Sequence, residues 1–341
     1  METTRSAASA SELDPRITSF LANRLGPAAA GVEVSPLSGD ASTRRYYRVT
    51  RPDGSRIVSL HVEPFDAEQL PFVIMRHLMA GWGIPVPAIL DQDGPRGILL
   101  LEDLGDLTLQ EALRGSSAAQ REEFYRVAAD QLVTLQREAA RSPQRAPCFQ
   151  VAFDIEKLAW ELHYFLKHFL EGHRGANLSV EDRAVLSEGF HRLSEEIASW
   201  PRVLCHRDYH SRNLMVQGEQ LVWIDFQDAR MGPATYDLVS LLRDSYVDVE
   251  EEFLEEQAEE FRQKALPREH GEVFRRRFDL MSVQRNLKAL GTFGYQASVK
   301  GNRVYLPYIP RTLANTRRNL SRYPELGPLW RVLANHIKEL R

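Results

Sequence analysis

A short stretch of the chain gathers the side chains that phosphoryl transfer requires. Asp208 follows a histidine by two residues, Asn213 comes five residues later, and Asp225 lies beyond an apolar run. Transfer of phosphate to an alcohol needs a carboxylate that orients the hydroxyl and accepts its proton, and oxygen ligands for magnesium on the nucleotide phosphates. Asp208 suits the first task, and Asn213 and Asp225 suit the second. These residues predict a phosphotransferase that uses ATP and Mg²⁺.

The surrounding residues indicate how these side chains converge. A short apolar strand precedes the polar run that carries Asp208 and Asn213, so that run should be a loop at the end of the strand. Two further apolar runs flank Gly218, as in a β-hairpin. Asp208 and Asn213 would leave one end of the hairpin and Asp225 the other, which brings them together. The predicted strands cover residues 203–205, 214–216 and 221–224.

Each piece of this pattern also has a purely structural explanation. Asp and Asn favour turns because their side chains bond to nearby backbone groups, and a buried Asp beside Arg can form a plain ion pair. A His-x-Asp sequence alone would be weak evidence. The ordered set, in which Asn213, a hairpin and then Asp225-Phe226 follow His206 and Asp208, favours catalysis.

The ordered set resembles the His-x-Asp-x-x-x-x-Asn signature of the aminoglycoside phosphotransferase and choline kinase superfamily. Within that group, the stretch from Asp225 to Asp244 is similar to the anomeric sugar kinases that act on N-acetylmuramate and N-acetylglucosamine in bacterial cell-wall recycling. The resemblance covers most of the chain. It implies ATP-dependent phosphorylation of the anomeric hydroxyl of an amino sugar to the sugar 1-phosphate, with Mg²⁺ held by Asn213 and Asp225.

The resemblance also implies an α+β fold, bilobal and protein-kinase-like, with a small β-rich N-lobe and a larger, mainly helical C-lobe. We expect a disordered leader at 1–15, an N-lobe at 16–103 with the phosphate loop and hinge, and a C-lobe at 104–341 with the catalytic loop and acceptor site. Apolar periodicity predicts helices at 17–25, 67–81, 107–113, 120–141, 155–170 and 181–200, and strands at 32–34, 46–50 and 56–62. The predicted inner face of the helix at 67–81 consists of Leu70, Val73, Ile74, His77 and Leu78.

Small residues followed by two arginines occupy the segment between the first two predicted strands. The backbone N–H groups of such a turn can approach phosphate oxygens, and arginine adds charge-assisted bonds. An ordinary turn with solvated arginines is the alternative, but the position ahead of the catalytic segment favours phosphate binding. The residues assigned to this loop are Gly39, Ser42, Thr43, Arg44 and Arg45.

No lysine precedes Lys157. Protein kinases and aminoglycoside kinases place a phosphate-binding lysine on the third strand, whereas the anomeric sugar kinases depart from it, so its absence narrows the resemblance to them. Arg44, Arg45 or His61 would then substitute for it, and the rigid fork of arginine would place the phosphates differently. By analogy with a kinase hinge, the backbone from Glu102 to Leu104 is expected to bind adenine.

Three residues are candidates for the acceptor site. Trp160 and Glu161 offer an aromatic plate and a hydroxyl acceptor, which suit a pyranose with an apolar face and a polar rim. The alternative is a core aromatic beside an exposed Glu. Arg285 could pair with a substrate carboxylate such as the lactyl group of N-acetylmuramate, or it could form a structural ion pair. Both assignments rest mainly on the resemblance.

Two acidic features are predicted to be structural. Asp237 should accept backbone hydrogen bonds from the catalytic loop and so hold Asp208 in place. The acidic run at 248–260 is expected to form a solvated helix.

The composition limits the possible partners. The chain has 341 residues and a net charge of −4, which argues against nucleic acid or an anionic membrane as a partner. Its two cysteines, Cys148 and Cys205, are far apart, so neither a disulfide framework nor a zinc site is expected. No apolar run approaches the roughly 20 residues of a membrane span, and no signal peptide is expected. We expect a cytoplasmic monomer whose partner is a small-molecule amino sugar.

Two other functions remain open at this point. A kinase of another small alcohol, such as an aminoglycoside, choline, homoserine or another sugar, would keep the same catalytic centre and differ in its acceptor pocket. A pseudokinase that binds nucleotide without catalysis would usually lack a catalytic Asp or a metal ligand. Asp208, Asn213 and Asp225 are all present, which favours an enzyme.

Overall fold

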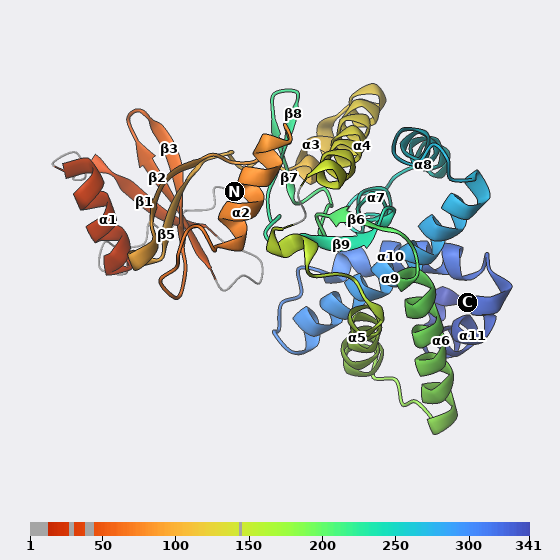
Figure 1. The fold of residues 1–341 in the computed structure, drawn as a ribbon. Coiled ribbons are helices and arrows are strands. Elements are labelled where there is room, and N and C mark those ends of the chain that lie inside the picture. The colour runs from red at the N-terminus through yellow and green to blue at the C-terminus, as the bar shows by residue number, and fades with distance from the viewer. Residues whose placement is uncertain (1–12, 27–30, 38–43, 143–144) are drawn as a thin grey trace.

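The computed structural model describes residues 13–26, 31–37, 44–142 and 145–341 and shows two lobes (Figure 1). The N-lobe holds a five-stranded antiparallel sheet in the order β1-β2-β3-β5-β4, and the rest of the chain is mainly helical. The predicted bilobal α+β fold is confirmed. The strands of this sheet are β1 (Glu33–Leu37), β2 (Arg45–Arg51), β3 (Gly54–Leu60), β4 (Ile89–Asp93) and β5 (Ile98–Glu102).

Helix α1 (Pro15–Leu25) packs on one face of this sheet and confirms the predicted opening helix. Asp14 caps it by accepting a hydrogen bond from the N–H of Arg16, and Pro15 occupies the first turn, where a missing N–H costs nothing. Its apolar side and the facing strand residues form a small core of their own. That core consists of Ile17, Phe20, Leu21, Tyr47, Val49, Val58, Leu60 and Ile98.

Helix α2 (Pro71–Gly81) begins later than predicted and turns a different side inward. Pro71 sets the start because it fits the first turn of a helix, while the residue before a proline is held extended. The buried residues are Phe72, Val73, Met75 and Met79. Of the predicted inner face only Val73 is fully buried, and His77 is exposed. The prediction of a packed His77 is therefore wrong.

Ten α-helical or π-helical segments build the described part of the C-lobe. They are α3 (Leu109–Gly115), α4 (Ala118–Arg141), α5 (Ile155–Phe165), the π-helical η4 (Leu166–His173), α6 (Val180–Ala198), α7 (Tyr236–Leu242), α8 (Glu251–Ala265), α9 (Gly271–Ser298), α10 (Ile309–Leu320) and α11 (Gly327–His336). Single 3₁₀ turns lie at Gly94–Arg96, Pro147–Phe149, Leu306–Tyr308, Pro324–Leu326 and Lys338–Leu340. The acidic helix α8 is only partly solvated, because Leu254 and Phe261 on it are buried.

The catalytic segment lies between two small antiparallel ladders. Strands β7 (Leu214–Gln217) and β8 (Gln220–Trp223) form the predicted hairpin, which is confirmed. Strand β6 (Arg202–Cys205) pairs with β9 (Arg230–Pro233). The sequence pattern does not predict β9, because Gly232 and Pro233 are residue types that usually interrupt strands.

Helix α9 is the long central helix of the C-lobe and packs against α5, η4, α7 and α10. Two glycines allow its backbone to approach neighbouring backbone. A Cβ at Gly291 would lie 2.8 Å from the Cα of Phe165, and one at Gly294 would lie 2.4 Å from the carbonyl oxygen of His168. The two glycines therefore let the backbone of α9 pack directly against that of α5 and η4.

No helix within the described residues is long and apolar enough to cross a bilayer.

Candidate active site

His206 fixes the start of the loop between β6 and β7. Its Nδ1 accepts a hydrogen bond from the N–H of Asp208 at 3.3 Å, and its Nε2 lies 3.0 Å from the carbonyl oxygen of Ile224. These two partners require the tautomer that carries its proton on Nε2. Burial lowers the pKa of His206 to about 4, so the ring is neutral near pH 7. The histidine thus joins the catalytic loop to the residue before Asp225.

Two buried carboxylates near the two ends of α7 hold the rest of the loop. Asp237 accepts hydrogen bonds from the backbone N–H of His206 at 2.6 Å and of Arg207 at 3.0 Å. Asp244 accepts one from the N–H of Ser211 at 2.9 Å. Burial raises the pKa of both carboxyl groups, that of Asp237 to about 7. The predicted backbone bonds to Asp237 are confirmed, whereas the matching role of Asp244 was not predicted.

The structure brings together the three residues predicted to carry the chemistry. Nδ2 of Asn213 lies 2.9 Å from the carbonyl oxygen of Asp208 and 3.5 Å from Oδ2 of Asp225. The described residues contain no metal-binding group of three or more His, Cys, Asp or Glu. Mg²⁺, however, usually takes only one or two protein ligands and completes its shell with phosphate oxygens and water. The side-chain oxygens of Asn213 and Asp225 fit that ion.

Backbone strain is concentrated at this centre. Among the described residues, the non-glycine residues with positive φ are Arg207 at 91° and Asp225 at 64°. Such conformations cost about 1–3 kcal/mol each and persist where surrounding bonds enforce them. Here the N–H of Arg207 is held by Asp237 at 3.0 Å, and Oδ1 of Asp225 accepts from Gln227 at 2.7 Å. One strained residue, Arg207, immediately precedes Asp208, and the other is Asp225 itself.

Asp208 is surrounded by cations. Its Oδ1 lies 2.8 Å from Nζ of Lys288 and 3.6 Å from a guanidinium nitrogen of Arg285, and its Oδ2 lies 3.8 Å from Nε of Arg207. Burial alone would raise the pKa of Asp208, but these three charges hold it well below its usual range. The carboxylate is therefore ionised and suited to accept a hydrogen bond from an alcohol.

A sequence comparison identifies the group of proteins to which this centre belongs. Residues 33–273 match the phosphotransferase enzyme family. The chain belongs to this family. It is 34% identical over 308 residues to an N-acetylmuramate/N-acetylglucosamine kinase of Neisseria meningitidis, covering 88% of this chain and 89% of that protein. It is 35% identical over 309 residues to a kinase of the same name from Pseudomonas aeruginosa, covering 89% and 88%.

Solved structures show the same fold. An ADP-bound aminoglycoside phosphotransferase superposes with a TM-score of 0.60 at 14% identity, over 89% of this chain and 98% of that one. A choline/ethanolamine kinase family protein from Mesorhizobium loti gives a TM-score of 0.57 at 17% identity, over 96% and 98%. At these identities the likeness establishes the kinase-like fold of this phosphotransferase and leaves its acceptor to other arguments.

The predicted phosphate-binding residues of this phosphotransferase are only partly described. Gly39, Ser42 and Thr43 lie outside the described residues. Arg44 lies near Asp225, where burial raises the pKa of the carboxyl and the charge of Arg44 opposes that rise. The structure therefore places one arginine of the predicted loop on the side of the predicted metal ligands.

Arg45 and His61 are less suited to supply charge to the phosphates. The guanidinium of Arg45 forms an ion pair with Asp14 at the start of α1, on the face of β2 that also carries Tyr47 and Val49. Burial and the charge of Arg44 lower the pKa of His61 to about 4, so its ring is neutral near pH 7. Of the three proposed substitutes for the missing lysine, Arg44 alone combines a charge with a position near Asp225.

The hinge residues lie at the end of β5. Glu102 is bound to Ala88 by its own N–H at 2.9 Å and by its Oε2 at 3.0 Å. The next residue, Asp103, accepts two hydrogen bonds from Arg48, at 2.6 and 3.0 Å. Because the N–H of Glu102 is already paired, adenine would have to use other backbone groups between Glu102 and Leu104.

Trp160 and Glu161 on α5, the two residues predicted for the acceptor site, lie in different surroundings. The side chain of Trp160 is 54% exposed and lies under the ammonium of Lys157, whereas Glu161 is 2% exposed. Oε2 of Glu161 accepts a hydrogen bond from Gln284 on α9 at 2.9 Å. The alternative of a core Trp beside an exposed Glu is therefore wrong, because the burial is reversed. Successive helical residues point about 100° apart, so the two side chains face different surroundings.

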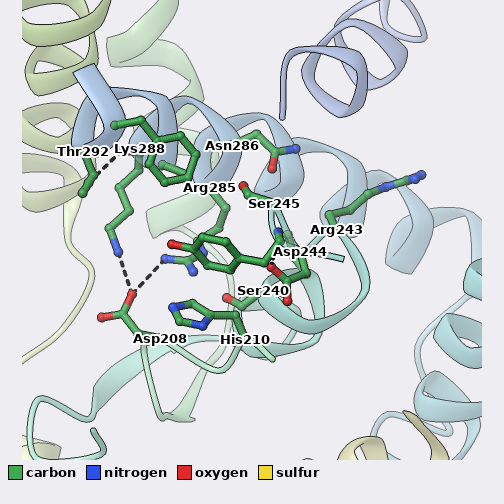
Figure 2. A pocket seen from close by; sticks show the side chains of 14 residues that line it. Asp208, His210, Ser240, Arg243, Asp244, Ser245, Arg285, Asn286, Lys288 and Thr292 are labelled. Atoms are coloured by element: carbon green, nitrogen blue, oxygen red, sulfur yellow. Dashed lines mark hydrogen bonds and ion pairs between the residues drawn. The ribbon is translucent and has the colours of Figure 1, made fainter. Parts of the chain in front are cut away.

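A cavity of about 130 Å³ adjoins Asp208. Its lining includes Lys288 and His210, which were not among the predicted site residues. Figure 2 shows Lys288 and Arg285 reaching from α9 to Asp208, with His210 beside them. Arg285 is 9% exposed and also donates to the hydroxyl of Tyr236 at 3.0 Å. Lys288 and His210 carry no sequence signal of their own, because their importance depends on contacts made only in the folded chain.

Proposed function

We propose that this phosphotransferase transfers the γ-phosphoryl group of ATP to the anomeric hydroxyl of N-acetylmuramate, N-acetylglucosamine or both. The observation that carries the reaction class is the convergence of Asp208 with Asn213 and Asp225. The relatives at 34% and 35% identity, which bear the name of these two substrates, support the choice of acceptor. The product would be a sugar 1-phosphate.

Each group that this chemistry requires has a candidate residue. Asp208 orients the hydroxyl through Oδ2 and accepts its proton, while Asn213 and Asp225 hold the nucleotide's Mg²⁺. Bound Mg²⁺ supplies positive charge that screens the phosphate oxygens. Arg44 adds charge from the N-lobe, in agreement with its electrostatic effect on Asp225. His206 keeps Asp208 and Asp225 in register through Ile224.

Two buried atoms support a sugar site between α5 and α9. Oε1 of Glu161, which has Nζ of Lys157 at 3.8 Å, and Nε of Arg285 have no hydrogen-bond partner within the part of the chain that the structure describes. An unpaired buried polar atom costs about 1–3 kcal/mol, so a ligand that bonds to it gains that much in return. We assign Glu161 to a sugar hydroxyl and Arg285 to the lactyl carboxylate of N-acetylmuramate. Trp160 is assigned to the apolar face of the pyranose at the more exposed side.

The test is a screen of ATP consumption with N-acetylmuramate, N-acetylglucosamine, simple hexoses, choline and kanamycin. We expect turnover of the two amino sugars, with a product that has lost its reducing end and shows a phosphorus signal coupled to the anomeric proton. Asp208→Ala should reduce turnover about 1,000-fold, within the range attributed to a general base, and leave ATP binding intact. Turnover of choline or kanamycin alone would contradict the proposed acceptor, and near-normal turnover by Asp208→Ala would contradict the reaction class.

A further inference from the structure

The two oxygens of the Asp208 carboxylate have different surroundings. Oδ1 accepts a hydrogen bond from Nζ of Lys288 at 2.8 Å and has Arg285 at 3.6 Å. Oδ2 has Nε of Arg207 at 3.8 Å, which is too long for a hydrogen bond. The guanidinium of Arg207 donates instead to Asp228 at 2.8 Å. One oxygen is therefore held by the protein, and the other keeps its lone pairs for an acceptor hydroxyl.

Lys288 is committed to this contact. Its side chain is 17% exposed and lines the cavity beside Asp208, and within the described chain Asp208 is the carboxylate to which it donates (Figure 2). A lysine has four side-chain torsions, so holding its ammonium in one place costs entropy. A lysine that served only to keep the surface soluble would rarely be held in one place, so the contact with Asp208 indicates a specific role.

The backbone that carries Lys288 is closely packed. Gly291, less than one turn further along α9, allows the helix to approach α5, where a Cβ would come within 2.8 Å of the Cα of Phe165. The hydroxyl of Thr292 donates to the carbonyl oxygen of Lys288 at 3.3 Å. Because α9 packs directly on the backbone of α5, the position of Lys288 relative to Asp208 is set by the packing of the two helices.

We propose that Lys288 is a positioning residue that fixes the Asp208 carboxylate through Oδ1, so that Oδ2 faces the hydroxyl that is phosphorylated. Without Lys288 the carboxylate can rotate about its terminal torsion, which is broad in aspartate. A misplacement of about 1 Å can reduce turnover about 100-fold. The inference rests on the proposed function only in requiring an alcohol acceptor, and it does not depend on which sugar that acceptor is.

The experiment compares Lys288→Ala, Lys288→Met and Lys288→Arg with wild type, using both amino sugars. We expect kcat to fall about 100-fold for Lys288→Ala and Lys288→Met with either sugar, while KM for sugar and for ATP changes less than about threefold. Lys288→Arg should recover much of the loss, because it restores a cation beside Oδ1. Added ethylammonium should raise the kcat of Lys288→Ala but not that of Lys288→Met, whose side chain fills the space. Lys167→Ala, at an exposed lysine on η4, is the matched control and should behave as wild type.

Three outcomes would overturn the inference. A kcat within threefold of wild type for folded Lys288→Met would show that Asp208 needs no such support. A loss confined to KM for N-acetylmuramate would make Lys288 a ligand of the lactyl carboxylate instead. A loss of kcat in all three variants without rescue by arginine or amine would indicate a structural role, and thermal melts identify unfolded variants. If wild type phosphorylates neither sugar, the proposed acceptor is wrong, and the same comparison applies to whichever alcohol it does phosphorylate.

Discussion

The C-lobe side of the active site is built from buried polar groups with fixed partners, whereas the described N-lobe side contributes the charge of Arg44. Asp237 and Asp244 bind backbone N–H groups of the catalytic loop, and His206 binds two more backbone groups. In the N-lobe, Arg44 lies near Asp225 and opposes the rise in the pKa of its carboxyl, while Arg45 pairs with Asp14 instead. The C-lobe therefore fixes the predicted reacting residues, and the N-lobe adds charge beside them.

The cores of the two lobes show the same division. The core between α1 and the sheet is separate, while the other face of the sheet joins the large core of the C-lobe through α2. The ring of Phe72 on α2 stacks on Phe226, next to Asp225, with centroids 4.9 Å apart. Changes in the C-lobe network should therefore cost both stability and turnover, and changes near α1 should cost little of either.

The largest effect is expected from Asp237→Ala. The change leaves the buried N–H groups of His206 and Arg207 without an acceptor, at about 2 kcal/mol each, so the free energy of unfolding should fall by about 4 kcal/mol. Turnover should fall about 100-fold, because the loop that carries Asp208 loses its register. Urea denaturation and steady-state kinetics measure the two losses. Asp237→Asn keeps one oxygen acceptor, so its free energy of unfolding should lie between those of Asp237→Ala and wild type. Equal stability of the Ala and Asn variants would contradict the role of these hydrogen bonds.

Acid should remove the next largest part of the stability. His206 has a folded pKa of about 4 and an unfolded value of 6.5, so the unfolded chain binds more protons between these values. The stability that depends on the neutral His206 ring is fully present above pH 6.5 and is lost as pH falls to 4. At 1.36 kcal/mol for each unit of pKa, the loss amounts to about 3 kcal/mol.

The measurement is urea denaturation of wild type and His206→Gln at pH 7 and pH 5. Gln can still donate to the carbonyl oxygen of Ile224 but does not titrate, so the variant should lose less stability between the two pH values. Other buried histidines titrate equally in both proteins and cancel in the difference. Equal losses would mean that folding leaves the pKa of His206 near its unfolded value.

The close contact between α9 and η4 gives an intermediate prediction. A methyl group at Gly294 would meet the carbonyl oxygen of His168 at 2.4 Å, and backbone atoms yield less readily than side chains. Gly294→Ala should therefore destabilise the protein by about 2 kcal/mol, despite the better helix propensity of alanine. Gly271→Ala is the control, because a Cβ there meets nothing within 4 Å. Thermal unfolding distinguishes the two, and equal midpoints would show that the helices move apart without cost.

The parts of this site that sequence predicts are those whose residues lie close together in the chain. The loop, the hairpin and the aspartate after it are connected by short segments, so strand and turn patterns suffice to bring Asp208, Asn213 and Asp225 together. Lys288 is different, because its partner lies 80 residues away. Helix α9 also buries polar and apolar residues around most of its surface, so it lacks the apolar stripe from which a helix and its inner face are usually predicted.

The placement of Arg45 shows a prediction that sequence could have refined. Tyr47 and Val49 are buried against α1, and alternate residues of a strand share a face. Arg45, the first residue of β2, therefore lies on the α1 side, whereas Arg44 precedes the strand. The sequence analysis grouped Arg44 with Arg45 because it assigned both to the loop, although the strand begins at Arg45.

The smallest effect is accordingly expected from Arg45→Ala. Its side chain is 56% exposed in the ion pair with Asp14, and ion pairs of exposed arginines contribute about 0–1 kcal/mol, so stability should change by less than about 1 kcal/mol and KM for ATP by less than about twofold. Arg44→Ala is the matched variant and should raise KM for ATP about tenfold, which corresponds to about 1.4 kcal/mol of lost charge-assisted bonding. Kinetics at saturating sugar measure both. If Arg45→Ala weakened ATP binding as much as Arg44→Ala, both arginines would reach the nucleotide, and the assignment of Arg45 to the α1 side of the sheet would be wrong.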